Sequence, residues 1–368
     1  MTTEQTSLTQ NEPLRILSLD GGSILTLISL YLLRRMVTLE NDFLSRVNVI
    51  AGTSAGAFNG LVLAQTDLGA ASAGQTIDHC IKFWEEDALN LTRNSVIGTV
   101  EAWTGLGAVY QTEALFAYYR DHFFGDTRLS QLKKKVAITS FQLDSYHPLD
   151  SLKAQDGANG FRSWQPIVYH NFETIHRHDK TQTHPLEDHN PHLKVVDVAL
   201  ASGSPPILSP IYNGHLDGGV FANNPAMAAL TLMLRSELLG PETSPGSVLN
   251  RSIVLSLGTG RNPLYVQTSQ QFTNWGYSQW LIDLKEPLLL IESLFEAAML
   301  AVDYQCRHLL GENRYVRINP ELQKTIHRHE PINSQHHSAL VERLWETTES
   351  ISTATLQRYL ETLKSAGW

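Results

Sequence analysis

The beginning of the chain contains two consecutive units in which a short apolar run enters a glycine-containing turn and a longer apolar run follows. In the first unit, Leu14–Leu19 (LRILSL) leads into Asp-Gly-Gly, and residues 25–36 are long and leucine-rich enough for a buried helix. In the second unit, residues 47–51 run into GTSAG, and the apolar stretch AFNGLVLAQ follows. A repeated strand–turn–helix order predicts parallel strands, because each helix returns the chain to the end of the sheet where the previous strand began.

Later segments extend this architecture. Residues 195–201 should be helical, residues 215–221 a short strand or turn, and the final segment, 337–365, has leucines near helical spacing and predicts amphipathic helices. Further strands are predicted at residues 135–141, 166–172, 253–257 and 315–318. We therefore expect an α/β fold, a three-layer sandwich with a mainly parallel central sheet and helices on both faces.

The composition disfavours several classes of protein. Apolar residues make up 42% of the 368 residues and charged residues only 18%, so the chain can build a substantial core. The net charge of −9 argues against nucleic-acid binding and against general attraction to anionic membranes. Cys80 and Cys306 are too few for a disulfide framework or a cysteine-based zinc site, and we expect buried free thiols.

No segment has the length and composition of a membrane span. The best candidate, residues 287–302, contains two glutamates and predicts a buried amphipathic helix instead. The polar start of the chain lacks the apolar core of a secretory signal. The expectation is a cytoplasmic protein that reaches lipid only by surface contact, with export lacking a cleaved signal left open.

A serine in the second turn has the surroundings of a catalytic nucleophile. GTSAG, residues 52–56, matches G-x-S-x-G, in which small residues allow a sharp turn between strand and helix that exposes the central serine, here Ser54. An ordinary Gly-rich turn is the alternative. The usual order of serine, acid and histidine is disfavoured because Ser54 follows only the second strand. Among fifteen histidines, only His215 lies near a candidate acid, Asp217, and a packing or surface role is the better interpretation of His215.

Three motifs together resemble the patatin-like phospholipase family. They are LDGG at residues 19–22, GTSAG at residues 52–56 and DGGVFANNP at residues 217–225. Two further stretches support the resemblance, ASGSPPILSP at residues 201–210 and SLGTG at residues 256–260. The match in order and spacing covers roughly residues 14–320. It implies a flexible tail at 1–13, a patatin-like catalytic domain at 14–335, and C-terminal amphipathic helices at 336–368 that pack on the same domain.

The resemblance also implies a chemistry. Ser54 would be the nucleophile and Asp217 its base in a serine–aspartate dyad, with no metal and no cofactor. Backbone N–H groups of Gly21, Gly22 and Ser23 would form the oxyanion hole. In the family this turn is D-G-G-G-x-[RK]-G, whereas here it is DGGSILT, so a serine replaces the third glycine and a leucine replaces the basic residue. If the third position needs a positive φ, Ser23 carries backbone strain.

The activity that the resemblance implies is a serine esterase of the phospholipase A type, which cleaves fatty-acyl esters of lipids or phospholipids through an acyl-enzyme. The substrate would be membrane or micellar lipid. Two alternatives stay open. One is a weakened or regulated relative that binds lipid or a protein partner, and the other is a related serine thioesterase or acyltransferase.

Other polar and aromatic signals favour structural roles. A histidine-rich run from His170 to His192 matches no standard metal site, so a solvated loop is expected. Core packing is the default for four aromatic residues that could otherwise line an acyl site or meet a membrane. They are Phe58, Trp103, Trp275 and Trp280.

Overall fold

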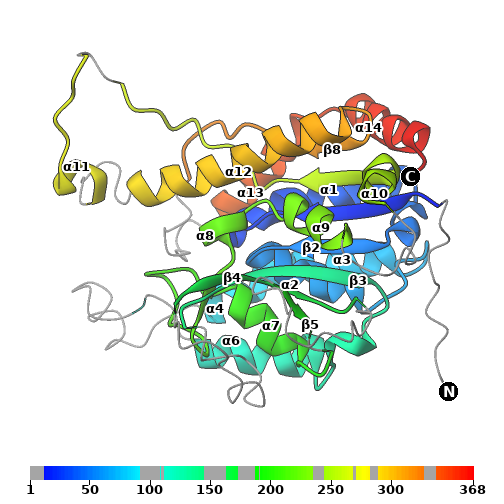
Figure 1. Cartoon of the computed structure of the whole chain (residues 1–368), viewed down its shortest axis with the longest axis horizontal. Coiled ribbons are helices and arrows are strands. Elements are labelled where there is room, and N and C mark those ends of the chain that lie inside the picture. The colour runs from blue at the N-terminus through cyan, green and yellow to red at the C-terminus, as the bar shows by residue number, and fades with distance from the viewer. Residues whose placement is uncertain are drawn as a thin grey trace.

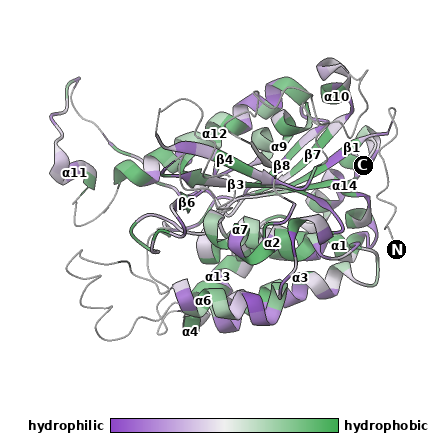
Figure 2. Cartoon of the chain, turned by 60° about the horizontal axis from the view of Figure 1, so that its bottom comes forward, coloured by the Kyte–Doolittle hydropathy of each residue, from purple (hydrophilic) through white to green (hydrophobic). Residues whose placement is uncertain are grey.

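One mixed sheet runs through the computed structural model, and helices cover both of its faces (Figures 1 and 2). The structure describes residues 12–91, 108, 112–144, 163–172, 187–189, 191–234, 244–267, 271–281, 289–326 and 337–368. The strands are β1 (Leu14–Leu19), β2 (Val49–Gly52), β3 (Lys135–Gln142), β4 (Gln165–His170), β5 (Glu187–His189), β6 (His215–Asp217), β7 (Ser252–Leu257) and β8 (Tyr315–Ile318). Their order is β5-β4-β3-β2-β1-β7-β8, and β6 pairs with β3.

The expected α/β class with a mainly parallel sheet is confirmed. Strand β1 lies centrally and pairs in parallel with β2 and β7, while β3 pairs antiparallel with β4 and β6. The register places Leu19 opposite both Gly52 and Leu257, the last residues of β2 and β7. Because these strands run in the same direction, the turns that follow them meet at one edge of the sheet.

Side chains alternate between the two faces of the sheet. On β1, Leu17 and Leu19 belong to one core cluster, and Leu14 and Ile16 belong to the other. The first cluster packs against α1 (Thr26–Leu39), α2 (Ala55–Ala64), α3 (Ala73–Lys82), α7 (Val195–Ser202), α13 (His337–Glu349) and α14 (Thr353–Ala366). The second packs against α9 (Ala226–Met233), α10 (Pro245–Arg251) and α12 (Leu289–Leu310). This division explains the apolar runs of the central strands, which are buried on both sides.

Short helices complete the described chain. They are η1 (Ser23–Leu25), η2 (Phe43–Arg46), η3 (Phe83–Asp87), α4 (Ala88–Leu91), α6 (Thr112–Tyr119), η4 (Arg120–Phe124), η5 (Leu129–Gln131), α8 (Gly219–Ala222) and α11 (Tyr277–Leu281). The C-terminal helices α13 and α14 contact α1, and α14 also contacts β7 and β8. The expected N-terminal tail lies almost wholly outside the described residues. The domain boundaries themselves stay a prediction.

The helix expected at residues 287–302 is present as α12, but it is not a buried helix. Only one side of it faces the sheet, through residues such as Met299 and Cys306, whereas Leu294 is 61% exposed and Leu300 is 43% exposed. Its leucine content therefore overstated its burial. Within the described ranges, we find no helix long and apolar enough to cross a membrane. Cys80 and Cys306 are both buried and free.

Candidate active site

The turn after β2 holds Ser54 in a backbone conformation that L-residues rarely adopt. Ser54 has φ 55° and ψ −125° and immediately precedes α2. A Cβ built on Gly56 would lie only 2.3 Å from the backbone oxygen of Leu19, so only glycine allows α2 to begin this close to β1. The N–H of Ser54 donates to the hydroxyl of Ser202, 2.9 Å away. Close backbone packing thus produces the partly exposed, strained serine that the motif predicts.

Asp217 reaches the serine from the end of β6, the strand that pairs with β3. The Ser54 hydroxyl lies near enough to the Asp217 carboxylate to lower its pKa, although 163 positions separate the two residues (217 − 54). Oδ1 of Asp217 also accepts the N–H of Gly219 at 2.7 Å. The side chain is almost fully buried, and this burial raises the pKa of Asp217 to about 6, although the nearby Ser54 hydroxyl and the Gly219 N–H oppose the rise. Asp217 is therefore ionised at neutral pH and able to accept a proton.

His215 is committed to packing. It is fully buried, its Nε2 lies 2.8 Å from the hydroxyl of Tyr169, and its Nδ1 lies 2.7 Å from the backbone oxygen of Asn213. Both ring nitrogens thus have protein partners other than Ser54. This arrangement leaves Asp217, rather than His215, as the base nearest the serine hydroxyl.

The turn after β1 lies beside the serine. A Cβ built on Gly21 would lie 3.1 Å from Cβ of Ser54, and Gly22 and Ser23 line the same pocket as Ser54 and Asp217. The N–H of Gly21 donates to the backbone oxygen of Asn223 at 3.1 Å. Gly22 and Ser23 stand at the beginning of η1, where the first N–H groups of a helix have no intrahelical acceptor.

A mostly apolar pocket opens above the serine. Besides the turn residues and Asn223, its wall consists of Pro205, Pro206, Ile207, Leu208, Ile291, Glu292 and Phe295. The first four belong to the segment after α7, and the last three belong to the first turns of α12. Such a wall suits an acyl chain, because contact removes the apolar surfaces of both the chain and the wall from water.

Comparisons with known proteins agree with this geometry. A family model described as Patatin-like phospholipase matches residues 17–230, which is more than half of the chain. The chain belongs to the patatin-like phospholipase family. It is 28% identical to the sporulation protein CotR of Bacillus subtilis, over 71% of this chain and 67% of that protein. It is also 26% identical to Patatin-like protein 2 of Arabidopsis thaliana, over 83% of this chain and 75% of that protein.

A likeness to a solved structure, the type III effector protein ExoU, is slight. It covers 95% of this chain but only 53% of the ExoU chain, with a TM-score of 0.31 and 11% sequence identity. Membership of the patatin-like family rests instead on the family match and on the motifs of the chain itself.

The two departures from the family turn have different structural consequences. Ser23, at the third glycine position, has φ 50°, so this position does require a positive φ, and the serine carries strain. Leu25, at the basic position, is 1% exposed and belongs to the main core cluster. A cation at position 25 would be buried among apolar side chains in this chain.

Several residues around the proposed dyad were not among the predicted site residues. Ser202 accepts the N–H of Ser54, and Thr53 forms hydroxyl contacts at 2.7 Å with Thr139 and 2.6 Å with the backbone oxygen of Ala222. Ser202 and Ala222 do lie within recognised stretches, so those stretches carried the signal. Thr139 lies on a strand with no motif and could be found only through strand pairing.

The structure describes some of the aromatic and histidine residues for which structural roles were predicted. Phe58 is 1% exposed and stacks on Tyr119 with ring centroids 4.3 Å apart, which confirms core packing. Core packing is wrong for Trp275 and Trp280, which are only half-buried, belong to neither core cluster and contact each other edge to face, whereas Trp103 lies outside the described residues. Most of the histidine-rich run also lies outside them. The part of the chain that the structure describes holds no group of three or more side chains able to bind a metal.

Proposed function

We propose that this chain is a lipid acyl hydrolase that uses Ser54 as the nucleophile and Asp217 as the base. The observation that carries the proposal is that Ser54 and the buried Asp217 carboxylate line the same mostly apolar pocket, close enough for the Ser54 hydroxyl to affect the pKa of Asp217. A pKa of about 6 suits Asp217 to this task, since the group is ionised at pH 7 yet still binds a proton appreciably. Membership of a phospholipase family supports the same class of substrate.

The proposed reaction has two halves. Ser54 Oγ attacks the carbonyl carbon of a fatty-acyl ester while Asp217 takes the hydroxyl proton, and a tetrahedral oxyanion forms. The oxyanion collapses, the ester C–O bond breaks, and the departing alkoxide takes the proton from Asp217. Water then attacks the acyl-enzyme with the same assistance and releases the fatty acid and free Ser54.

The N–H groups of Gly22 and Ser23 are the best candidates for oxyanion donors. Both residues line the pocket beside Ser54, whereas the N–H of Gly21 is already bonded to Asn223. Gly21 would then shape the turn and approach the serine closely rather than donate. Each preorganised donor is worth about 3 kcal/mol of barrier in comparable sites.

The decisive experiment is a product assay. The purified chain and Ser54→Ala are incubated with mixed vesicles of phospholipids, lysophospholipids and acylglycerols, and the products are identified by mass spectrometry. We expect Ser54-dependent release of fatty acid. Parallel incubations with added alcohols and with acyl thioesters test the alternatives. Preferred acyl transfer to the alcohol would indicate an acyltransferase, thioester cleavage alone a thioesterase, and lipid binding without any turnover a non-catalytic relative.

A further inference from the structure

The turn that carries the proposed oxyanion donors is anchored by a buried ion pair. Asp20, the residue before Gly21, is 0% exposed, and its two carboxylate oxygens accept hydrogen bonds from the two terminal nitrogens of Arg317 at 2.8 and 2.5 Å. The Arg317 side chain is 5% exposed. Burial alone would lower the pKa of Arg317, but the Asp20 carboxylate overrides this and raises it. The pair is therefore ionised and bidentate.

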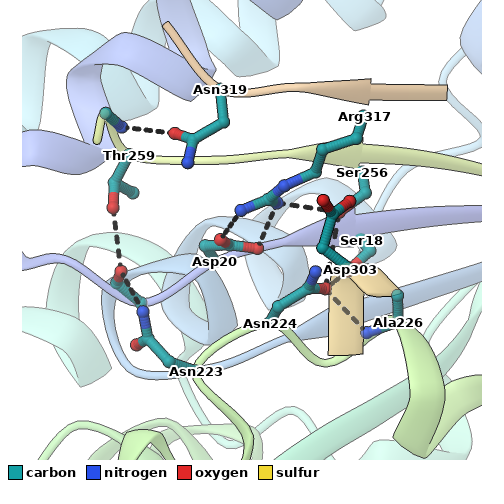
Figure 3. A network of polar contacts seen from close by, with 12 residues as sticks. Ser18, Asp20, Asn223, Asn224, Ala226, Ser256, Thr259, Asp303, Arg317 and Asn319 are labelled. Atoms are coloured by element: carbon teal, nitrogen blue, oxygen red, sulfur yellow. Dashed lines mark hydrogen bonds and ion pairs between the residues drawn. The ribbon is translucent and has the colours of Figure 1, made fainter. Parts of the chain in front are cut away.

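The strand register explains why an arginine so distant in sequence reaches this turn. Ser18 on β1 is opposite Ser256 on β7, and Ser256 is opposite Arg317 on β8. These three residues form one row across the sheet and project from the same face. Asp20 follows Ser18 by two residues, just beyond the end of β1. The guanidinium crosses β7, donates to the Ser256 hydroxyl at 2.9 Å, and ends on Asp20 (Figure 3).

The same network holds the next peptide of the turn. The backbone oxygen of Gly21 accepts hydrogen bonds from Thr259 Oγ1 at 3.0 Å and from Asn223 Nδ2 at 3.3 Å (Figure 3). The Gly21 carbonyl and the Gly22 N–H belong to one planar peptide unit, so fixing the carbonyl also fixes the direction of that N–H. Asn224 joins the network through the hydroxyls of Ser18 and Ser256. Asn223 and Asn224 lie six and seven residues after Asp217. The network therefore contacts both the turn after β1 and the segment that follows Asp217.

We propose that Arg317 is a positioning residue, which holds the Asp20–Gly21–Gly22 backbone in the geometry that stabilises the oxyanion. The proposal rests on the proposed acyl-hydrolase function. Arg317 also balances the negative charge of the buried Asp20, which lies next to a site where negative charge develops. In this chain Leu25 occupies the position that is basic in the family pattern. The cation that contacts this turn is instead Arg317, which lies on β8 and binds Asp20.

The test uses three changes of the ion pair and a short-chain nitrophenyl ester that dissolves as monomers. Arg317→Met should lower kcat by about 10- to 100-fold and leave KM within about twofold, because the donors act on the transition state and not on the bound substrate. Arg317→Lys keeps the charge but cannot form the bidentate contact, so its kcat should fall between those of the wild type and Arg317→Met.

Because a lone buried Asp20 would also lower stability, the double variant Asp20→Asn with Arg317→Met separates the two effects. It removes both charges, so its melting temperature should recover toward that of the wild type, while kcat stays at least tenfold lower. The matched control is Arg34→Met, which removes an exposed arginine–aspartate pair with Asp78 and should leave kcat and melting temperature nearly unchanged.

The outcomes separate this proposal from the proposed function. If the wild type shows no hydrolysis that depends on Ser54, the proposed function fails. If the wild type is active but the double variant recovers both its melting temperature and its full kcat, Arg317 only neutralises a buried charge and the positioning role is wrong. A rise in KM with unchanged kcat would also overturn it, because it would mean a role in substrate binding.

Discussion

The two turns that meet at the sheet edge are built by different means. In the GTSAG turn, Gly52 and Gly56 are required because added Cβ atoms would meet backbone atoms of Ala57 and Leu19 at 2.6 and 2.3 Å. In the DGGSILT turn, the close neighbours of Gly22 are side-chain atoms of Thr259, and the Gly21 carbonyl is held by side chains distant in sequence. The first turn is thus constrained by closely packed backbone, and the second depends on side chains from distant parts of the chain. The GTSAG turn matches the family motif, whereas the DGGSILT turn departs from it at two of the positions compared, Ser23 and Leu25.

The largest effect is expected at the proposed nucleophile, Ser54. Ser54→Ala should abolish labelling by a fluorophosphonate probe and lower ester hydrolysis by at least about 10³-fold. Ser54→Gly should be equally inactive but more stable than Ser54→Ala by about 1 kcal/mol, because glycine adopts φ 55° without strain. Mass spectrometry of the labelled peptide and chemical denaturation measure the two effects. Labelling that persists in Ser54→Ala would place the nucleophile elsewhere.

The second largest loss of activity is expected at the proposed base, Asp217. Asp217→Asn keeps the shape but removes the proton acceptor, so kcat should fall by about 10²-fold or more. The acid limb of the wild-type pH profile should lie near pH 6, because activity requires the ionised form of a group whose pKa is about 6. His215→Gln serves as the control and should cost much less activity. An equal loss in both variants would favour a triad that includes His215.

Asp217→Asn, which should lower activity, should raise the stability of the folded protein. The pKa of Asp217 is raised from 3.8 to about 6 on folding, so the folded state binds the proton more tightly and loses stability as the pH rises between these values. Asp217→Asn should therefore melt at a higher temperature than the wild type at pH 8. This advantage should shrink as the pH falls from 6 to 4. An advantage that is independent of pH would mean that the carboxylate carries no burial cost.

A smaller effect, on stability rather than chemistry, separates the two turns. Gly56→Ala should lower the free energy of unfolding by about 2–3 kcal/mol, because the new Cβ would meet the fixed backbone oxygen of Leu19. Gly246→Ala is the matched control, since a Cβ there meets nothing within 4 Å. Denaturation midpoints of both variants give the comparison. If Gly56→Ala is tolerated as well as the control, the close approach of α2 to the backbone of Leu19 does not fix the serine turn.

The smallest effect is expected at Ser23. Ser23→Gly relieves a positive φ and should raise stability by up to about 1 kcal/mol, while kcat changes by less than about tenfold. A gain of several hundredfold at unchanged stability would instead mean that the natural turn is a switched-off oxyanion hole. Ser23 is the better position to change, because Leu25 is buried in the core and an arginine there would disturb folding.

Local patterns indicated much of the fold. The apolar runs predicted β1 and β8 to the residue and β2 and β7 within two residues, because strands covered by helices on both faces are mostly apolar. The sequence did not indicate how β3 is paired: it is parallel to β2 but antiparallel to β4 and β6. The half-exposed α12 was expected to be buried, because hydrophobicity along a helix does not say how much of its surface finds a partner.

Local motifs specify the positions where the backbone leaves little choice of residue, above all the GTSAG turn and its strained Ser54. The distant groups that complete the site are brought together only by the folded sheet. Asp217 approaches Ser54 through the pairing of β6 with β3, and Arg317 approaches Asp20 through a side-chain row across β1, β7 and β8. The physical reason is one of range: steric limits act between neighbours in the chain and are written in local motifs, whereas an ion pair needs only proximity in space, which any strand can supply once the sheet has formed.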